Sequence, residues 1–179
     1  MKQKAAPEGR LTIREMKIED LPAIYHLGEE LFTAEKWKAL YRTWDEYEVV
    51  ERFLVDSDYC FVAEIEDTIV GFVFGTVIHK RRSAWSYGYM MWLGVAKKLA
   101  RRGVGKRLLG TLEAAFLHDN CRIVIADTAM ENKGANKFFL KNGFEQTSKH
   151  VYFSKNLQTA QDEEENERPS RRRKKRTRR

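Results

Sequence analysis

The chain has 179 residues, of which 42% are hydrophobic and 33% are charged, and its formal net charge at pH 7 is +7. This length suffices for one ordinary hydrophobic core, so we expect a single folded domain. The sequence contains no run close to the roughly 18 apolar residues of a membrane span, and its first ten residues lack the apolar region of a signal peptide. We therefore expect a soluble, cytoplasmic protein that makes no membrane contact.

Most of the positive charge lies at the two ends of the chain. Residues 158–179 contain nine basic and five acidic residues, and residues 1–10 contain three basic residues and one acidic residue, which leaves a net charge of +1 for residues 11–157. The C-terminal segment has an acidic block followed by the basic run RRRKKRTRR, with no aromatic residue and no aliphatic residue larger than alanine. We expect the first segment to be flexible and the last to be disordered, with weak polyanion contact through its basic run.

The apolar periodicity of residues 11–157 predicts strands and helices in the order βααβββαβαβ. The predicted ranges, in this order, are 11–16, 18–32, 34–54, 59–67, 68–80, 86–95, 103–116, 121–128, 132–142 and 151–157. Asp20 stands where the first helix would have its N-cap, and Gly143 would end the last helix. This order predicts an α/β fold with a central mixed sheet and helices on both of its faces.

The cysteines and histidines give no sign of a metal site. Cys60 and Cys121 each lie in an apolar run, which favours buried free thiols and is typical of a reducing compartment. His26 and His79 each lack a second histidine at ligand spacing. We therefore expect no metal ion and no disulfide.

Two glycines, Gly103 and Gly105, lie at the start of the helix predicted over 103–116. The residues beside them are basic, namely Arg101, Arg102, Lys106 and Arg107. The free N–H groups and the dipole of a helix start attract anions, and glycine lets a phosphate approach the backbone. This pattern indicates a pyrophosphate site; the alternative is a glycine turn before a solvated basic helix face.

Two familiar phosphate-binding loops do not match this stretch. A Walker loop requires a glycine and a Ser or Thr at the positions of Ala100 and Arg107. A dinucleotide-binding fingerprint requires Gly or Ala at the position of Leu108, after the first strand of a βαβ unit. Both classes of nucleotide-binding protein are therefore excluded.

Three linked segments match a third pattern: the strand end WLGV, the loop RRGVG and the segment ENKGANKFFLKNGF. With them the chain from about Leu11 to Leu157 resembles the Gcn5-related N-acetyltransferases (GNAT). The family's Asn-x-x-Ala and closing Gly-Phe have their counterparts in Asn132, Ala135, Gly143 and Phe144. The resemblance implies a GNAT fold that binds acetyl-CoA as co-substrate, without a metal. The acetyl group would pass to a protein N-terminus, a lysine or a small amine.

The resemblance also implies which residues hold acetyl-CoA. The pantetheine arm would pair, as an added strand, with the main chain of Leu93, Gly94 and Val95, where one amide would polarise the thioester carbonyl. The pyrophosphate would be held by the main chain of Arg101, Arg102, Gly103, Val104, Gly105 and Lys106. The end of the pantetheine arm would bond Asn132, and Phe139 would lie beside the sulfur. Ala100 departs from the family's usual Gln or Arg, so that Arg101 and Arg102 would substitute.

The base has to be placed separately, because transfer needs a neutral amine. The family often carries a carboxylate six residues before the position of Val95, but Tyr89 stands there, and a phenol with a pKa of about 10 is a poor base. Members that acetylate ribosomal proteins carry the carboxylate five residues before the motif's asparagine, where Asp127 stands. We predict that Asp127 is the base; the alternative is an aspartate that caps the turn before the last helix.

The acid that would protonate the departing thiolate is also missing from its usual position in the family. Many relatives have a tyrosine at the position of Phe139, which cannot donate a proton. Tyr87, Tyr89 or Tyr152 would reach in from neighbouring strands, or the thiolate would leave unaided, since a thiol has a pKa of only about 8.5.

Several aromatic and acidic residues are candidates for the site that binds the acceptor amine, and each group has two interpretations. Trp37, Tyr41 and Trp44 either pack in the core or shape the mouth of the acceptor site. Glu29, Glu30, Glu46 and Glu48 either attract a cationic amine or are solvated helix charges. The sequence leaves the oligomeric state open, a dimer included.

Two other functions stay open at this point. A catalytically inactive acyl-CoA sensor would explain why Phe139 and Tyr89 stand where acid and base often stand. A nucleic-acid-associated protein would use the basic C-terminal run. The nearly neutral body makes that run an accessory.

Overall fold

A computed structural model describes residues 9–33, 43–79, 85–146, 148 and 153 of the chain. The chain divides into two units, Met1–Gly143 and Phe144–Arg179. All the helices and strands named below belong to the first unit.

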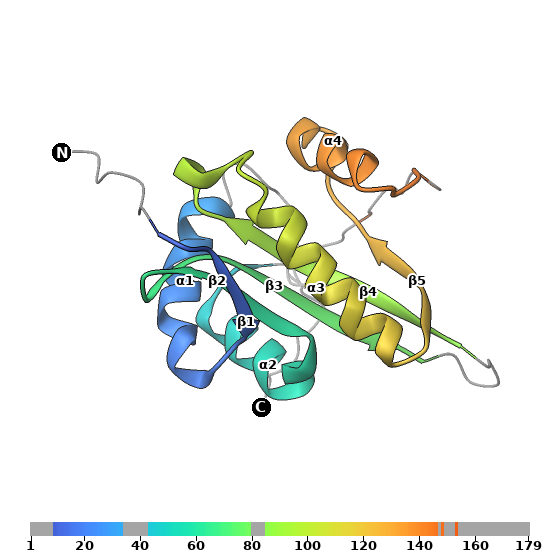
Figure 1. Ribbon diagram of the computed structural model, residues 1–179. Coiled ribbons are helices and arrows are strands. Elements are labelled where there is room, and N and C mark those ends of the chain that lie inside the picture. The colour runs from blue at the N-terminus through green and yellow to red at the C-terminus, as the bar shows by residue number, and fades with distance from the viewer. Residues whose placement is uncertain (1–8, 34–42, 80–84, 147, 149–152, 154–179) are drawn as a thin grey trace, which may run out of the picture. The chain divides into compact units, whose positions relative to one another are not determined.

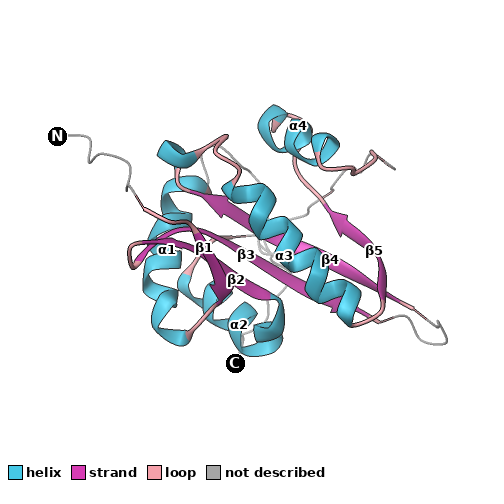
Figure 2. Ribbon diagram, viewed as in Figure 1, coloured by secondary structure: helices cyan, strands magenta, loops and turns pink. Residues whose placement is uncertain are grey.

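The first unit is built on one sheet of five strands, drawn in magenta in Figure 2, in the order β1-β2-β3-β4-β5. The strands are β1 (Thr12–Glu15), β2 (Cys60–Ile65), β3 (Thr68–Ile78), β4 (Ser86–Val95) and β5 (Cys121–Ala126). Neighbouring strands are antiparallel from β1 to β4, whereas β4 and β5 are parallel. The predicted mixed sheet is therefore confirmed.

Helices cover both faces of this sheet, as predicted (Figure 1). They are α1 (Leu21–Leu31), α2 (Glu46–Asp56), α3 (Val104–His118) and α4 (Lys133–Lys141). A Cβ added at Gly75 of β3 would meet Leu112 of α3, whereas the next residue back, Phe74, shares a buried cluster with Val49 of α2. Because successive strand residues face opposite ways, α3 covers one face, and α1 and α2 cover the other.

The predicted elements are present to within three residues at their described ends. Two predictions fall on undescribed parts of the chain. The first part of the helix predicted over 34–54, up to residue 42, lies outside the described residues. So does the last predicted strand, over 151–157, except for Phe153.

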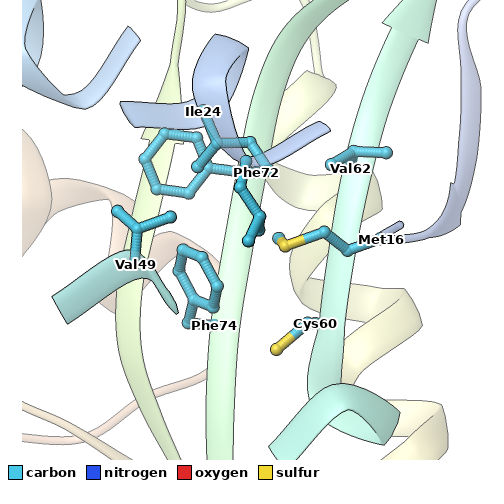
Figure 3. Close-up of a cluster of buried hydrophobic side chains, with 8 residues drawn as sticks. Met16, Ile24, Val49, Cys60, Val62, Phe72 and Phe74 are labelled. Carbon is cyan, nitrogen blue, oxygen red and sulfur yellow. The ribbon is translucent and has the colours of Figure 1, made fainter. Parts of the chain in front are cut away.

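One cluster of buried side chains lies between β2, β3 and the helices of the α1–α2 face. Figure 3 shows side chains from five parts of the chain meeting there, namely Met16, Ile24, Val49, Cys60, Val62, Phe72 and Phe74. Both cysteines are free and buried, as predicted. Burial raises the pKa of the Cys60 thiol to about 12, so this thiol stays protonated and unreactive at neutral pH.

Trp44 joins this core by packing directly on helix α1. Its ring stacks on Phe72 with 5.2 Å between ring centroids, and its Nε1 donates a hydrogen bond of 2.9 Å to the carbonyl of Tyr25. A Cβ added at Gly28 would overlap the indole ring. Trp44 is therefore a core residue, and Trp37 and Tyr41 lie outside the described residues.

We predict opposite effects of alanine at two helical glycines. Gly28→Ala should lower the free energy of unfolding by about 1–3 kcal/mol, because the new methyl group displaces Trp44. Gly110→Ala should raise it by about 0.5–1 kcal/mol, because nothing lies within 4 Å of a Cβ there and alanine favours a helix. Urea denaturation measures both values. A Gly28→Ala protein as stable as the wild type would contradict the packing of Trp44.

A group of charged side chains joins β1, the turn after it and β2. Arg14 donates two hydrogen bonds to the carboxylate of Asp20, at 2.7 and 2.9 Å, and two to Glu64, at 2.5 and 3.0 Å. Asp20 also accepts a bond of 2.8 Å from the backbone N–H of Lys17. The prediction that Asp20 is the N-cap residue of α1 is confirmed for its position. Asp20 holds the N-cap position, but its side chain makes no capping bond because Arg14 and Lys17 engage it.

Asp20 should make stability depend on pH. The hydrogen bond from Arg14 is the main cause that lowers the pKa of this carboxyl, so its contribution is present at neutral pH and is lost as the pH falls through that lowered pKa. Asp20→Asn should therefore cost about 1–3 kcal/mol near pH 7, and the gap from the wild type should narrow in acid. Urea denaturation across pH checks this, with the exposed neighbour Glu19 changed to Gln as control. A gap that is constant with pH would contradict it.

Candidate active site

Strand β4 contains one residue more than its partner across a short stretch. Phe74 pairs with Trp92, but the next residue of β3, Gly75, pairs with Met90, so Met91 is the extra residue of a β-bulge. On the other side, β5 pairs with β4 only as far as Met90, which lies opposite Ala126. From Met91 to Val95, no described strand pairs with this edge of β4. The bulge thus lies where β4 and β5 part.

The bulge also changes which face the side chains of β4 take. Before it, a Cβ at Gly88 would meet Phe116 of α3. After it, a Cβ at Gly94 would meet Phe72 on the opposite face, although the two positions differ by an even number. Leu93 and Val95 consequently turn towards α3, and the main chain between them forms the open edge.

The glycine loop ends beside this open edge. A Cβ built at Gly105 would lie 3.6 Å from Val95 of β4 and 3.4 Å from Phe138 of α4, so this glycine faces the space where β4, α3 and α4 come together. Arg101 and Gly103 have left-handed backbone angles, φ of 65° and 85°. Glycine adopts this conformation at no steric cost, whereas Arg101 is strained.

The start of α3 presents backbone N–H groups without a side-chain cap. The residue before α3, Gly103, has no side chain to cap it, and the N–H groups of Val104, Gly105 and Lys106 come before the first intrahelical donor, Arg107. The side chains of Arg101, Arg102 and Lys106 are exposed around this point. The site therefore has the N–H groups, the helix dipole and the positive charge that a phosphate group requires.

The two residues predicted to be catalytic lie in contact. Tyr89 of β4 pairs across the parallel ladder with Ile125, and Asp127 follows β5 directly. The hydroxyl of Tyr89 donates a hydrogen bond of 2.6 Å to Oδ1 of Asp127, whose residue is exposed. The pair lies on the α1–α2 face just before the bulge, because Tyr89 points away from α3, unlike its neighbour Gly88.

Asn132 and Phe139 lie on or beside α4. The side chain of Asn132 caps this helix, since Oδ1 accepts from the N–H of Ala135 at 3.1 Å, and Nδ2 donates to Thr128 at 3.1 Å. Phe139 lies edge-on to Phe138, with ring centroids 5.6 Å apart. Of these two rings, Phe138 is the one beside Gly105, a role that the sequence pattern did not reveal.

Other candidate residues have ordinary surroundings. His26 pairs with Glu29 on the exposed face of α1, and His79 lies 2.9 Å from the hydroxyl of Ser86. Within the described ranges, no three His, Cys, Asp or Glu side chains are grouped so as to hold a metal ion. None of the helices in these ranges is long and apolar enough to cross a membrane.

The fold and this site define a class of protein. The model of the acetyltransferase (GNAT) family matches residues 21–144, so the chain belongs to this family of acetyltransferases. N-alpha-acetyltransferase 30 of Xenopus laevis is 30% identical over 86 residues, which are 48% of this chain and 31% of that protein. The match thus spans about a third of that relative.

Solved structures share the fold at lower identity. The aminoglycoside acetyltransferase AAC(6′)-Iy, solved with the bisubstrate analogue CoA-S-monomethyl-acetylneamine, has a TM-score of 0.67 and 21% identity, over 83% of this chain and 99% of that one. Arabidopsis thaliana Naa50, solved with the bisubstrate analogue CoA-Ac-MVNAL, has a TM-score of 0.62 and 22% identity, over 77% of this chain and 85% of that one. The predicted family and fold are confirmed.

Proposed function

We propose that the protein is an acetyl-CoA-dependent N-acetyltransferase of the cytoplasm that acts on a primary amine. The observation that carries this proposal is the continuous arrangement along β4. The Tyr89–Asp127 pair precedes the bulge, the open edge from Met91 to Val95 follows it, and the uncapped start of α3 lies at its end. Each part suits one part of the reaction. The free, buried cysteines agree with a reducing compartment.

The residues present fit acetyl-CoA part by part. The N–H groups of Val104, Gly105 and Lys106 and the exposed side chains of Arg101 and Arg102 suit a pyrophosphate, and Gly105 leaves the space that a side chain would fill. The main chain of Leu93, Gly94 and Val95 suits the amide groups of pantetheine, because an open strand edge pairs with an extended chain. Asn132 keeps one N–H of Nδ2 beyond its bond to Thr128.

Acetyl-CoA supplies the activated acetyl group as a thioester, and the protein has to manage one proton. Asp127 accepts the proton that the attacking amine loses, as a general base. Its Oδ1 accepts the hydrogen bond from Tyr89, which orients the carboxylate for this role. Tyr89 in turn gives its hydroxyl proton to the departing sulfur and regains a proton from Asp127. The proton that leaves nitrogen thus ends on the thiol.

The acceptor is a protein N-terminus, a lysine or a small amine. A cationic amine is attracted to Asp127, which is exposed directly after β5, the strand that carries the exposed apolar side chains of Ile123 and Ile125. The solved relatives act on chemically different amines, so the acceptor has to be found with a panel of peptides, lysine side chains and small amines.

Valine at Gly105 should weaken CoA binding. Its methyl groups would occupy the space between Val95 and Phe138 and would block the first turn of α3. We expect Gly105→Val to raise the Kd for CoA by at least tenfold, or about 1.4 kcal/mol, in calorimetry. Gly110→Val on the same helix is the matched control, because its Cβ has open space. If Gly105→Val changes the Kd for CoA by less than about threefold, the loop is not the phosphate site.

Removal of the base should slow transfer without weakening CoA binding. In the wild type, release of the CoA thiol from acetyl-CoA should require an amine. Asp127→Asn should lower kcat by roughly a hundredfold, with little change in the KM for acetyl-CoA, because the amide keeps the shape but not the basicity. Glu131→Gln, a nearby exposed carboxylate, is the control.

Two outcomes of this assay would contradict the proposal. An Asp127→Asn protein with the wild-type rate but a lower melting temperature would make Asp127 a turn cap, with water as the proton acceptor. A wild type that binds acetyl-CoA in calorimetry but releases no thiol with any amine would be an acyl-CoA sensor.

A further inference from the structure

Helix α2 reaches across to β4 at the bulge. Trp92 donates a hydrogen bond of 2.8 Å from Nε1 to Oε1 of Glu48. One turn along the helix, Nη1 of Arg52 lies 3.8 Å from Sδ of Met91, the extra residue of the bulge. Two side chains of α2 therefore hold two consecutive residues of β4, at the point where β4 parts from β5.

This contact is mostly shielded from solvent. The side chains of Glu48 and Arg52 are each only 20% exposed, and Nε of Arg52 lies 3.4 Å from Oε1 of Glu48. Burial of a charge is costly unless the charge is paired and hydrogen-bonded, and the contacts with Arg52 and Trp92 offset this cost for the Glu48 carboxylate. One interpretation of the sequence was that Glu48 is a solvated helix charge. The structure shows instead a mostly buried carboxylate that contacts Arg52 and Trp92.

The hydrophobic core already attaches α2 to the sheet. Val49 of α2 is 1% exposed and belongs to the cluster that contains Phe74. Apolar packing is not directional, whereas a hydrogen bond fixes both distance and angle. The contribution of Glu48 is thus to set where the ring of Trp92, and with it the backbone after the bulge, comes to lie.

We propose that Glu48 is a positioning residue for acetyl transfer, which holds the bulge of β4 through Trp92 so that the open edge from Met91 to Val95 stands where the thioester arm pairs. This inference rests on the proposed function. Its physical basis is that a misplacement of about 1 Å costs a reaction up to a hundredfold in rate. The contacts of Glu48 that carry this inference are those with Trp92 and Arg52.

Glutamine and alanine at this position separate positioning from a direct role of the charge. Glu48→Gln keeps an oxygen that accepts the bond from Trp92, whereas Glu48→Ala removes it. Trp92→Phe keeps an aromatic ring beside Phe32 and Trp44 but removes the donor. Glu51→Ala is the matched control, because Glu51 pairs with Arg52 at 3.1 Å and is exposed.

The experiment measures amine-dependent thiol release and the hydrogen exchange of peptides that cover residues 86–95. Glu48→Ala and Trp92→Phe should each lower kcat about ten- to hundredfold, with the KM for acetyl-CoA changed less than about threefold, and should speed exchange after the bulge. Glu48→Gln and Glu51→Ala should stay within about threefold of the wild type in kcat. The double variant Glu48→Ala/Trp92→Phe should be no slower than either single variant, because both remove one bond.

Two kinetic results would overturn the proposal. A Glu48→Gln protein as slow as Glu48→Ala would mean that the charge itself acts, and additive losses in the double variant would mean that the two residues act separately. If the wild type transfers no acetyl group to any amine, the proposed function fails, and hydrogen exchange alone decides on the positioning. Faster exchange in Glu48→Ala and Trp92→Phe, but not in Glu48→Gln, would support it; equal exchange in all variants would overturn it.

Discussion

The extra residue in β4 is the feature on which the rest of the site depends. A regular strand would continue its ladder with β5 beyond Met90, and no edge would be left for another chain. The bulge at Met91 ends that pairing while the ladder with β3 continues to Val95. The first half of β4 therefore pairs with a strand on each side, whereas the second half pairs only with β3 and has an open edge. An open edge can pair with any extended chain. Other features next to the edge therefore have to select one ligand.

The charges of the first unit are arranged to suit such a ligand at both ends of the open edge. Exposed arginines and a helix start gather positive potential next to Val95, although residues 11–157 as a whole are nearly neutral. At the other end the Tyr89–Asp127 pair supplies a carboxylate. A ligand that lies along β4 thus has its anionic part at one end and its reacting part at the other. In the proposed function, this separation allows a nearly neutral body to bind a highly charged co-substrate.

The fold and the elements that form the candidate site could be predicted from the sequence, because they depend on local patterns. Strand β4 has the predicted limits, and the glycine loop opens α3 as its context indicated. Separate parts of the sequence pattern indicate Asp127 and Tyr89 as catalytic candidates. Only the parallel register of β4 and β5 brings the two side chains into contact. The bulge and the bond between Glu48 and Trp92 could not be predicted. Both depend on the register of β3 against β4 and on where α2 packs, which single-residue periodicity does not encode.

Hydrogen exchange in the presence of acetyl-CoA tests most directly whether the open edge of β4 is the binding site. From Met91 to Val95 one edge of β4 is paired by no described strand, and alternate backbone amides of this segment point to that edge, whereas the amides at the start of α3 lack a side-chain cap. The account predicts that saturating acetyl-CoA slows exchange in both segments, and leaves β1 and β2 unchanged. Protection confined to other parts of the chain, with exchange from Met91 to Lys106 unaltered, would contradict it.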